Sequence, residues 1–186
     1  MNTKIGSVLV AVACLVAANA SGADKGSDDG KRESRFAAKL KPTNEVPALS
    51  SEASGSFKLI VNEANQTLSF ELRYEDLEGP TTAAHIHVGQ KDVNGMISVF
   101  LCGTAPEGFP AVDPCPPAPA TVTGIITPAN IIGPAAQGIE ASTMDSHEFD
   151  ELVKLIRKGV TYANVHSARF PGGEIRGQIL SADKRR

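Results

Sequence analysis

From Phe36 onward, apolar and polar side chains alternate over short runs, and residues that favour turns separate these runs. Successive side chains of a β-strand point to opposite faces, so a period of two is typical of strands that bury one face. The clearest case is a pair of runs, 57–62 and 68–74, joined by a turn at Asn65 and Gln66. The pattern predicts that these two runs form a hairpin.

The remainder of the chain continues this pattern and adds one helix. Further strands are expected over residues 81–89, 96–101, 121–127, 160–166 and 174–180. A short helix is expected over about 146–158, because its apolar residues fall on one face. Asp145 and Glu148 could form a capping box at its start, and Gly159 could end it. These elements predict an all-β protein, an antiparallel, Greek-key-like β-sandwich with one short helix.

The first residues have the layout of a secretory signal peptide. Lys4 precedes an uncharged apolar run, and small residues at Ala18 and Ala20 suit cleavage after Ala20, with cleavage after Ala23 as the second choice. The run is shorter than the about 20 residues that a membrane-spanning helix needs, which disfavours an anchor. The short apolar stretch before Cys14 disfavours lipid attachment there. We therefore expect export to the periplasm or the extracellular space, with no transmembrane segment in the mature chain.

Four segments follow from this interpretation. They are a signal peptide (1–20), a disordered lead-in (21–35), one folded domain (36–181) and a basic tail (182–186).

Cleavage of the signal peptide removes Lys4 and no acid, so the formal charge changes from −3 to −4. A mildly acidic chain without a dense basic stripe gives no electrostatic footprint for nucleic acid.

The cysteines agree with export. Cys14 leaves with the signal peptide, so Cys102 and Cys115 remain as an even pair around a proline-rich segment. Such a pair in an oxidising compartment predicts a disulfide, which would stabilise the fold by about 3 kcal/mol through loop closure. The alternative is a metal site with two thiolates, but no histidine or further cysteine lies nearby in the sequence.

Three of the four histidines fall in predicted strands. His85 and His87 are two residues apart, so both imidazoles lie on one face of their strand, and His166 ends a later strand. Three imidazole nitrogens could bind copper or zinc and leave a coordination position open. The alternative is that these rings only form hydrogen bonds on a polar sheet face. His147, at the start of the helix, is expected on the surface and outside the site.

Arg176 and Glu174 share a face of the last predicted strand. They could form an ion pair that holds the strand register, or the guanidinium could lie beside the metal site and guide small anions.

The chain has no Gly-x-Ser-x-Gly motif and no phosphate-binding glycine loop, so a catalytic triad or nucleotide site is not expected. The absence of Trp disfavours a stacking platform for sugars or bases.

Four stretches together resemble the CHRD (chordin-type) domain family: residues 44–47 with 53–55, 77–89 with 94–95, 162–167, and 171–178. The family is named after repeats in chordin, an extracellular antagonist of bone morphogenetic proteins, and it also occurs as single domains in exported microbial proteins. The resemblance implies an exported β-module whose partner is an extracytoplasmic protein or a small ligand. It supplies no list of catalytic residues.

A looser similarity concerns copper-zinc superoxide dismutase, a β-sandwich enzyme with a His-x-His pair, a later copper-binding histidine and an arginine near its end. His85, His87, His166 and Arg176 occur in that order here, but nothing matches the bridging histidine or the zinc ligands. We therefore expect a binding or structural module whose three histidines either hold copper or zinc or have a structural role without a metal. The alternative is a copper-dependent, superoxide dismutase-like enzyme, in which Arg176 would guide superoxide.

Overall fold

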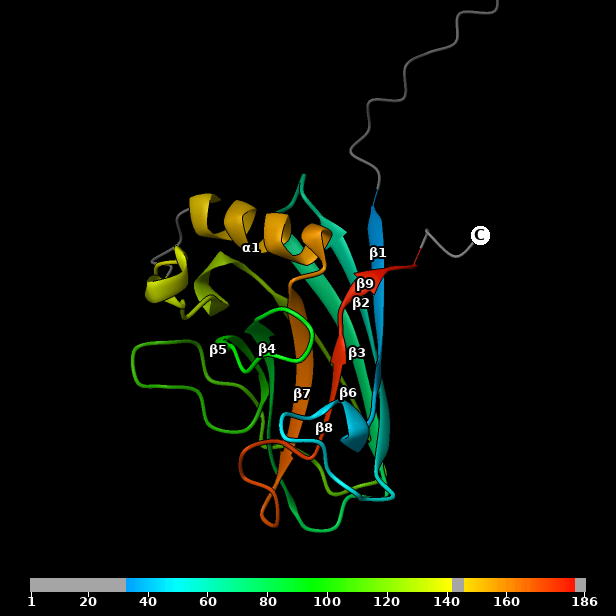
Figure 1. Ribbon diagram of the computed structural model, residues 1–186. Coiled ribbons are helices and arrows are strands. Elements are labelled where there is room, and N and C mark those ends of the chain that lie inside the picture. The colour runs from blue at the N-terminus through cyan, green and yellow to red at the C-terminus, as the bar shows by residue number, and fades with distance from the viewer. Residues whose placement is uncertain (1–32, 142–145, 183–186) are drawn as a thin grey trace, which may run out of the picture. The chain divides into compact units, whose positions relative to one another are not determined.

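The computed structural model describes residues 33–141 and 146–182 (Figure 1). Two antiparallel β-sheets pack face to face, and one α-helix lies across an end of them. This arrangement confirms the predicted all-β sandwich. The predicted signal peptide, most of the lead-in, the helix cap at Asp145 and most of the basic tail lie outside the described residues. No helix in the described part is long and apolar enough to cross a membrane.

One sheet has five strands in the order β6-β3-β2-β1-β9. Its strands are β1 (Ser34–Leu40), β2 (Ser54–Asn62), β3 (Thr67–Glu75), β6 (Ala120–Ile126) and β9 (Leu180–Ser181). The predicted hairpin is present as β2 and β3, with Leu59 opposite Phe70. Strand β1 begins at Ser34, so the fold starts two residues before the predicted boundary at Phe36.

The other sheet has four strands in the order β5-β4-β7-β8. Its strands are β4 (Thr81–Val88), β5 (Met96–Cys102), β7 (Thr161–Ser167) and β8 (Ile175–Gln178). The prediction of a single last strand over 174–180 is wrong in one respect. This segment divides into β8 in this sheet and β9 in the other sheet. Between them, the buried Ile179 donates its backbone N–H to Thr161 O, where the chain passes from one sheet to the other.

The space between the sheets is filled by the alternating apolar side chains that the sequence indicates. They include Phe57, Leu59, Leu72, Ile86 and Val165, all almost fully buried. The predicted helix is present as α1 (Ser146–Lys158), and its apolar face joins the same core through Phe149, Leu152, Val153 and Ile156. Gly159 ends it with a φ of 71°, a conformation that glycine adopts without steric cost.

The outer faces of the two sheets differ. The five-stranded sheet presents charged side chains to solvent, including the ion pair between Lys58 and Glu71. The outer face of the four-stranded sheet is covered by the segments 41–53 and 89–95, and every residue of β7 is buried. Sequence alternation predicts one buried face for a strand, whereas this sheet is buried on both faces. Its polar side chains therefore form an internal polar layer.

The predicted disulfide between Cys102 and Cys115 is present, with an S–S distance of 2.00 Å. It follows the end of β5 and closes the proline-rich loop, in which Gly103 N–H also donates to Asp113 O. Most of this loop lacks regular secondary structure, so the covalent link limits the freedom of a segment that few backbone hydrogen bonds hold.

We expect reduction of this disulfide to lower the free energy of unfolding by about 3 kcal/mol, because the two cysteines are 13 positions apart in the sequence and the open loop gains conformational entropy. Urea unfolding with and without a thiol reductant measures the difference. The variant with Cys102→Ala and Cys115→Ala serves as the control, and it should not respond to the reductant. Equal stability of the oxidised and the fully reduced wild-type protein would contradict the prediction.

Candidate metal centre

Three histidines from two adjacent strands converge in the polar layer of the four-stranded sheet. His85 and His87 lie on β4, and His166 lies near the end of the neighbouring β7. Their exposed fractions are only 5, 7 and 8%. One ligand nitrogen from each ring can be chosen so that all three lie within 4.8 Å of one another. The rings that the sequence singled out are therefore close enough to hold a metal ion.

Backbone carbonyls set the proton positions on two of these rings. His87 Nδ1 lies 3.1 Å from Gly95 O, and His166 Nδ1 lies 3.0 Å from Pro171 O. A carbonyl oxygen can only accept, so each Nδ1 carries the proton and each Nε2 keeps its lone pair in the neutral ring. Histidine ligands of metals are commonly oriented by this kind of contact at the other ring nitrogen.

The third ring, His85, is held by its neighbour. His85 Nδ1 lies 3.1 Å from His166 Nε2. Because His166 Nε2 is an acceptor, the proton of this hydrogen bond belongs to His85 Nδ1. Two imidazole nitrogens bound to one tetrahedral zinc ion at about 2.0–2.1 Å lie about 3.3 Å apart, close to the spacing seen here. An ion could therefore replace the shared proton once His85 loses it or shifts it to Nε2.

Two further observations bear on whether these residues fit a metal. The Nε2 atoms of His85 and His87 are buried without a hydrogen-bond partner. An unpaired polar atom in the interior costs free energy, and an ion coordinated by His87 Nε2 would remove that cost for this ring. The three donors lie up to 4.8 Å apart, whereas two nitrogens bound to one tetrahedral ion lie about 3.3 Å apart, so the most distant pair must approach by up to about 1.5 Å to bind one ion.

The histidines are electrically neutral at physiological pH. Burial, together with the smaller effects of the neighbouring His166 and His87, lowers the pKa of His85 to about 3. Burial also lowers the pKa of His87 to about 4, against the raising effect of the Gly95 carbonyl. The pKa of His166 is lowered by burial too. Neutral imidazole is the form that binds transition metals, so all three rings are ready to act as ligands.

Arg176 lies beside this cluster, but its guanidinium is directed into the protein. The residue is 2% exposed, and its guanidinium carbon lies 3.8 Å from the centroid of the Tyr162 ring. Tyr162 in turn stacks on His87, with ring centroids 4.8 Å apart and planes at 9°. Arg176 donates to Asn94 Oδ1 at 3.0 Å and to Val93 O at 2.8 Å.

The predicted ion pair between Arg176 and Glu174 is wrong. Glu174 Oε1 instead accepts from the Ser51 hydroxyl and from the backbone N–H of Glu78, both at 2.8 Å. Glu174 precedes β8 in the turn, where the strand alternation that would bring the two side chains together has not yet begun. His147 is exposed on α1, outside the cluster, as predicted.

Two residues of the polar layer were not identified from sequence. Asn164 lies on β7 opposite His85, and its side-chain amide donates to Glu45 Oε1 at 2.6 Å and to Ile175 O at 3.0 Å. Burial raises the pKa of Glu45 to about 7, against the lowering effects of Asn164 and Arg176. Asn164 shares the face of His166 by strand alternation, which could have suggested it. No local pattern places Glu45 there, because it arrives on the covering segment.

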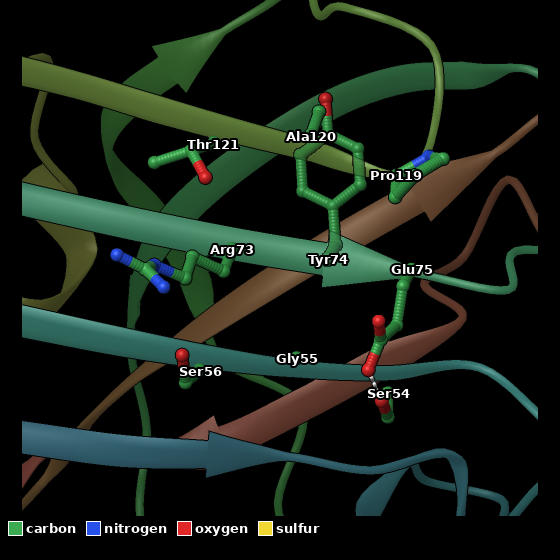
Figure 2. Close-up of a pocket in the computed structure, with 9 residues that line it drawn as sticks. All are labelled: Ser54, Gly55, Ser56, Arg73, Tyr74, Glu75, Pro119, Ala120 and Thr121. Atoms are coloured by element: carbon green, nitrogen blue, oxygen red, sulfur yellow. Dashed lines mark hydrogen bonds between the residues drawn. The ribbon is translucent and has the colours of Figure 1, made fainter.

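A hollow of about 500 Å³ lies elsewhere, over β2, β3 and β6 of the five-stranded sheet (Figure 2). Its lining combines small and charged residues, and in it Ser54 donates to Glu75 at 3.0 Å. No histidine or cysteine lines it, and among the described residues the only group of three or more potential metal ligands is the histidine cluster. The cluster therefore remains the candidate functional site.

The comparison with family models agrees with the resemblance described above. The family model for the CHRD domain matches residues 36–179, which is most of the chain. The chain belongs to the CHRD domain family. It matches no curated protein and no solved structure.

We expect the metal-free protein to lose stability as the pH falls from about 6.5 to about 4. Unfolded histidine binds a proton near pH 6.5, whereas folded His85 and His87 do so only near pH 3 and 4, so the unfolded state binds more protons in this window. Each ring then lowers the free energy of unfolding by on the order of 1 kcal/mol per pH unit. Urea unfolding in a chelator at a series of pH values measures the slope.

The variant Glu45→Gln is the matched comparison. Folded Glu45 takes up its proton near pH 7 and the unfolded side chain near pH 4.5, so it stabilises the folded state as the pH falls between these values. Its effect opposes that of the histidines, and the variant should lose stability more steeply above about pH 4.5. A flat stability profile from pH 6.5 to 4 in both proteins would show that the histidines are not held neutral by burial.

Proposed function

We propose that this CHRD domain is an exported binding module that holds one copper or zinc ion through His85, His87 and His166. The observation that carries the proposal is the convergence of three neutral, buried imidazoles whose donor nitrogens lie within 4.8 Å of one another. Imidazole suits both metals, and three protein ligands leave a position for water or for a ligand from a partner. Export accords with the disulfide and with the signal-peptide pattern of the N-terminus.

The chemistry of the surroundings supports coordination rather than a purely structural role. Backbone carbonyls orient His87 and His166 in the tautomer that leaves Nε2 without a proton, and the buried Nε2 atoms of His85 and His87 have no partner. A structural set of histidines would be expected to satisfy those nitrogens with protein groups.

The enzyme alternative, a copper-dependent superoxide dismutase, gains no support from Arg176. An arginine that guides an anion has to present its guanidinium to solvent or to the open coordination position. Here the guanidinium is 2% exposed and binds Val93 and Asn94. Binding without catalysis is therefore the function that the geometry supports best, with an extracytoplasmic protein or a small ligand as the partner.

We expect the purified, metal-free protein to bind one Zn²⁺ or Cu²⁺ ion per chain at pH 7.5, measured by isothermal titration calorimetry and by metal content after desalting. His166→Ala should weaken binding on the order of 100-fold, because it removes one of three ligands. Bound metal should also raise the midpoint of thermal unfolding.

His147→Ala is the control, since it removes a histidine that lies outside the cluster, and it should bind as the wild type does. The proposal fails if neither ion binds stoichiometrically or if His166→Ala binds equally well. A superoxide dismutation assay on the copper-loaded protein tests the enzyme alternative, which requires activity that His166→Ala abolishes.

A further inference from the structure

The segment 89–95 is the part of the cover that lies directly against the candidate ligands. It connects β4 to β5, and its last residue, Gly95, supplies the carbonyl oxygen that accepts from His87 Nδ1. A Cβ atom added to Gly95 would lie 1.8 Å from Val88 O, so this close approach requires glycine. The position of one carbonyl oxygen on this segment therefore decides which nitrogen of His87 carries the proton.

Hydrogen bonds hold this segment near its two ends. At its start, Gln178 donates to Gly89 O at 2.9 Å, whereas at its tip Lys91 and Asp92 are exposed and form an ion pair at 3.9 Å. Toward its end, the Arg176 guanidinium donates to Val93 O at 2.8 Å and to Asn94 Oδ1 at 3.0 Å. These two bonds come from one rigid, forked side chain and hold the two residues that immediately precede Gly95.

The same guanidinium also supports the second contact of Gly95. Gly95 N–H donates to the Tyr162 hydroxyl at 3.1 Å, and that hydroxyl lies 3.4 Å from Gly95 O. Arg176 packs over the Tyr162 ring, and Tyr162 stacks on His87. Because β7 lies between β4 and β8, the phenol ring lies between the imidazole and the guanidinium. Arg176 thus acts on His87 by two routes, one through the segment and one through the ring.

We infer that Arg176 is a positioning residue for the ligand His87, which it keeps in the Nδ1–H tautomer by fixing the carbonyl of Gly95. The inference rests on the proposed metal site for its biological meaning, but the tautomer itself is a property of the metal-free protein. It also accounts for a buried guanidinium that makes no ion pair among the described residues and is instead balanced by carbonyl, amide and aromatic partners.

The experiment measures the tautomer of each histidine in the metal-free protein by long-range ¹H–¹⁵N NMR of the imidazole nitrogens. In the wild type, His87 and His166 should both be in the Nδ1–H form. In Arg176→Gln, the Nε2–H form of His87 should become populated. His166 is the internal control, because it is held by Pro171 O on a different loop and should not change.

A second pair of variants covers the case in which Arg176→Gln does not fold. Asn94 is exposed in the connecting segment, so its substitution spares the core. Asn94→Ala removes the acceptor for Arg176, whereas Asn94→Asp keeps it; both lose the bond from the Asn94 amide to Val46 O. The Nε2–H form of His87 should appear in Asn94→Ala and not in Asn94→Asp.

Two results would overturn the inference: His87 staying in the Nδ1–H form in folded Arg176→Gln and Asn94→Ala, or His87 and His166 changing together. In the second case the variants would merely loosen the whole layer. Zn²⁺ titration of the same proteins should show about 10-fold or greater weakening in Asn94→Ala, as for other groups that orient a metal ligand. If the wild type binds neither Zn²⁺ nor Cu²⁺, the proposed function fails, and the tautomer measurement still decides the role of Arg176.

Discussion

The burial of a polar sheet face is the constraint on which the rest of this structure depends. The four-stranded sheet has the apolar core on one side and the segments 41–53 and 89–95 on the other. Removal of water from that second face makes charged imidazole costly, which is why burial is the largest influence on the pKa of His85, His87 and His166. The same removal makes every hydrogen bond in the layer matter, because water cannot replace a missing partner.

Within this layer, the rings are oriented by contacts beyond those of their own strands, most of them from loops that pack against the sheet. The strands place the three imidazoles on one face, but they leave the rings free to rotate and to exchange protons between their two nitrogens. The carbonyls of Gly95 and Pro171 remove that freedom for two rings, and His166 removes it for His85. Arg176 and Asn164 then bind the covering segments to the sheet through Val93, Asn94 and Glu45. A layer of this kind orients its donor atoms before any ion arrives.

Local patterns were reliable wherever one side of an element faces the core. The hairpin of β2 and β3, the helix ended by Gly159 and the pairing of Cys102 with Cys115 were all predicted, because alternation, helical period and cysteine count report directly on burial and covalent chemistry. Two predictions failed where the outcome depends on distant segments. The last strand divides between the sheets at Ile179, and Glu174 bonds to Ser51 and Glu78 rather than to Arg176.

The sequence by itself therefore determined the fold class, the membership of the CHRD family and the three candidate histidines, of which His85 and His87 share one face of their strand. Only the tertiary structure decided that these rings are buried and neutral, that their protons lie on Nδ1, and that Arg176 points inward to Val93 and Asn94 instead of outward to solvent. The physical reason is that side-chain alternation depends on neighbours along the chain, whereas solvent access and hydrogen-bond partners on an outer sheet face depend on loops that fold back from far away in the sequence.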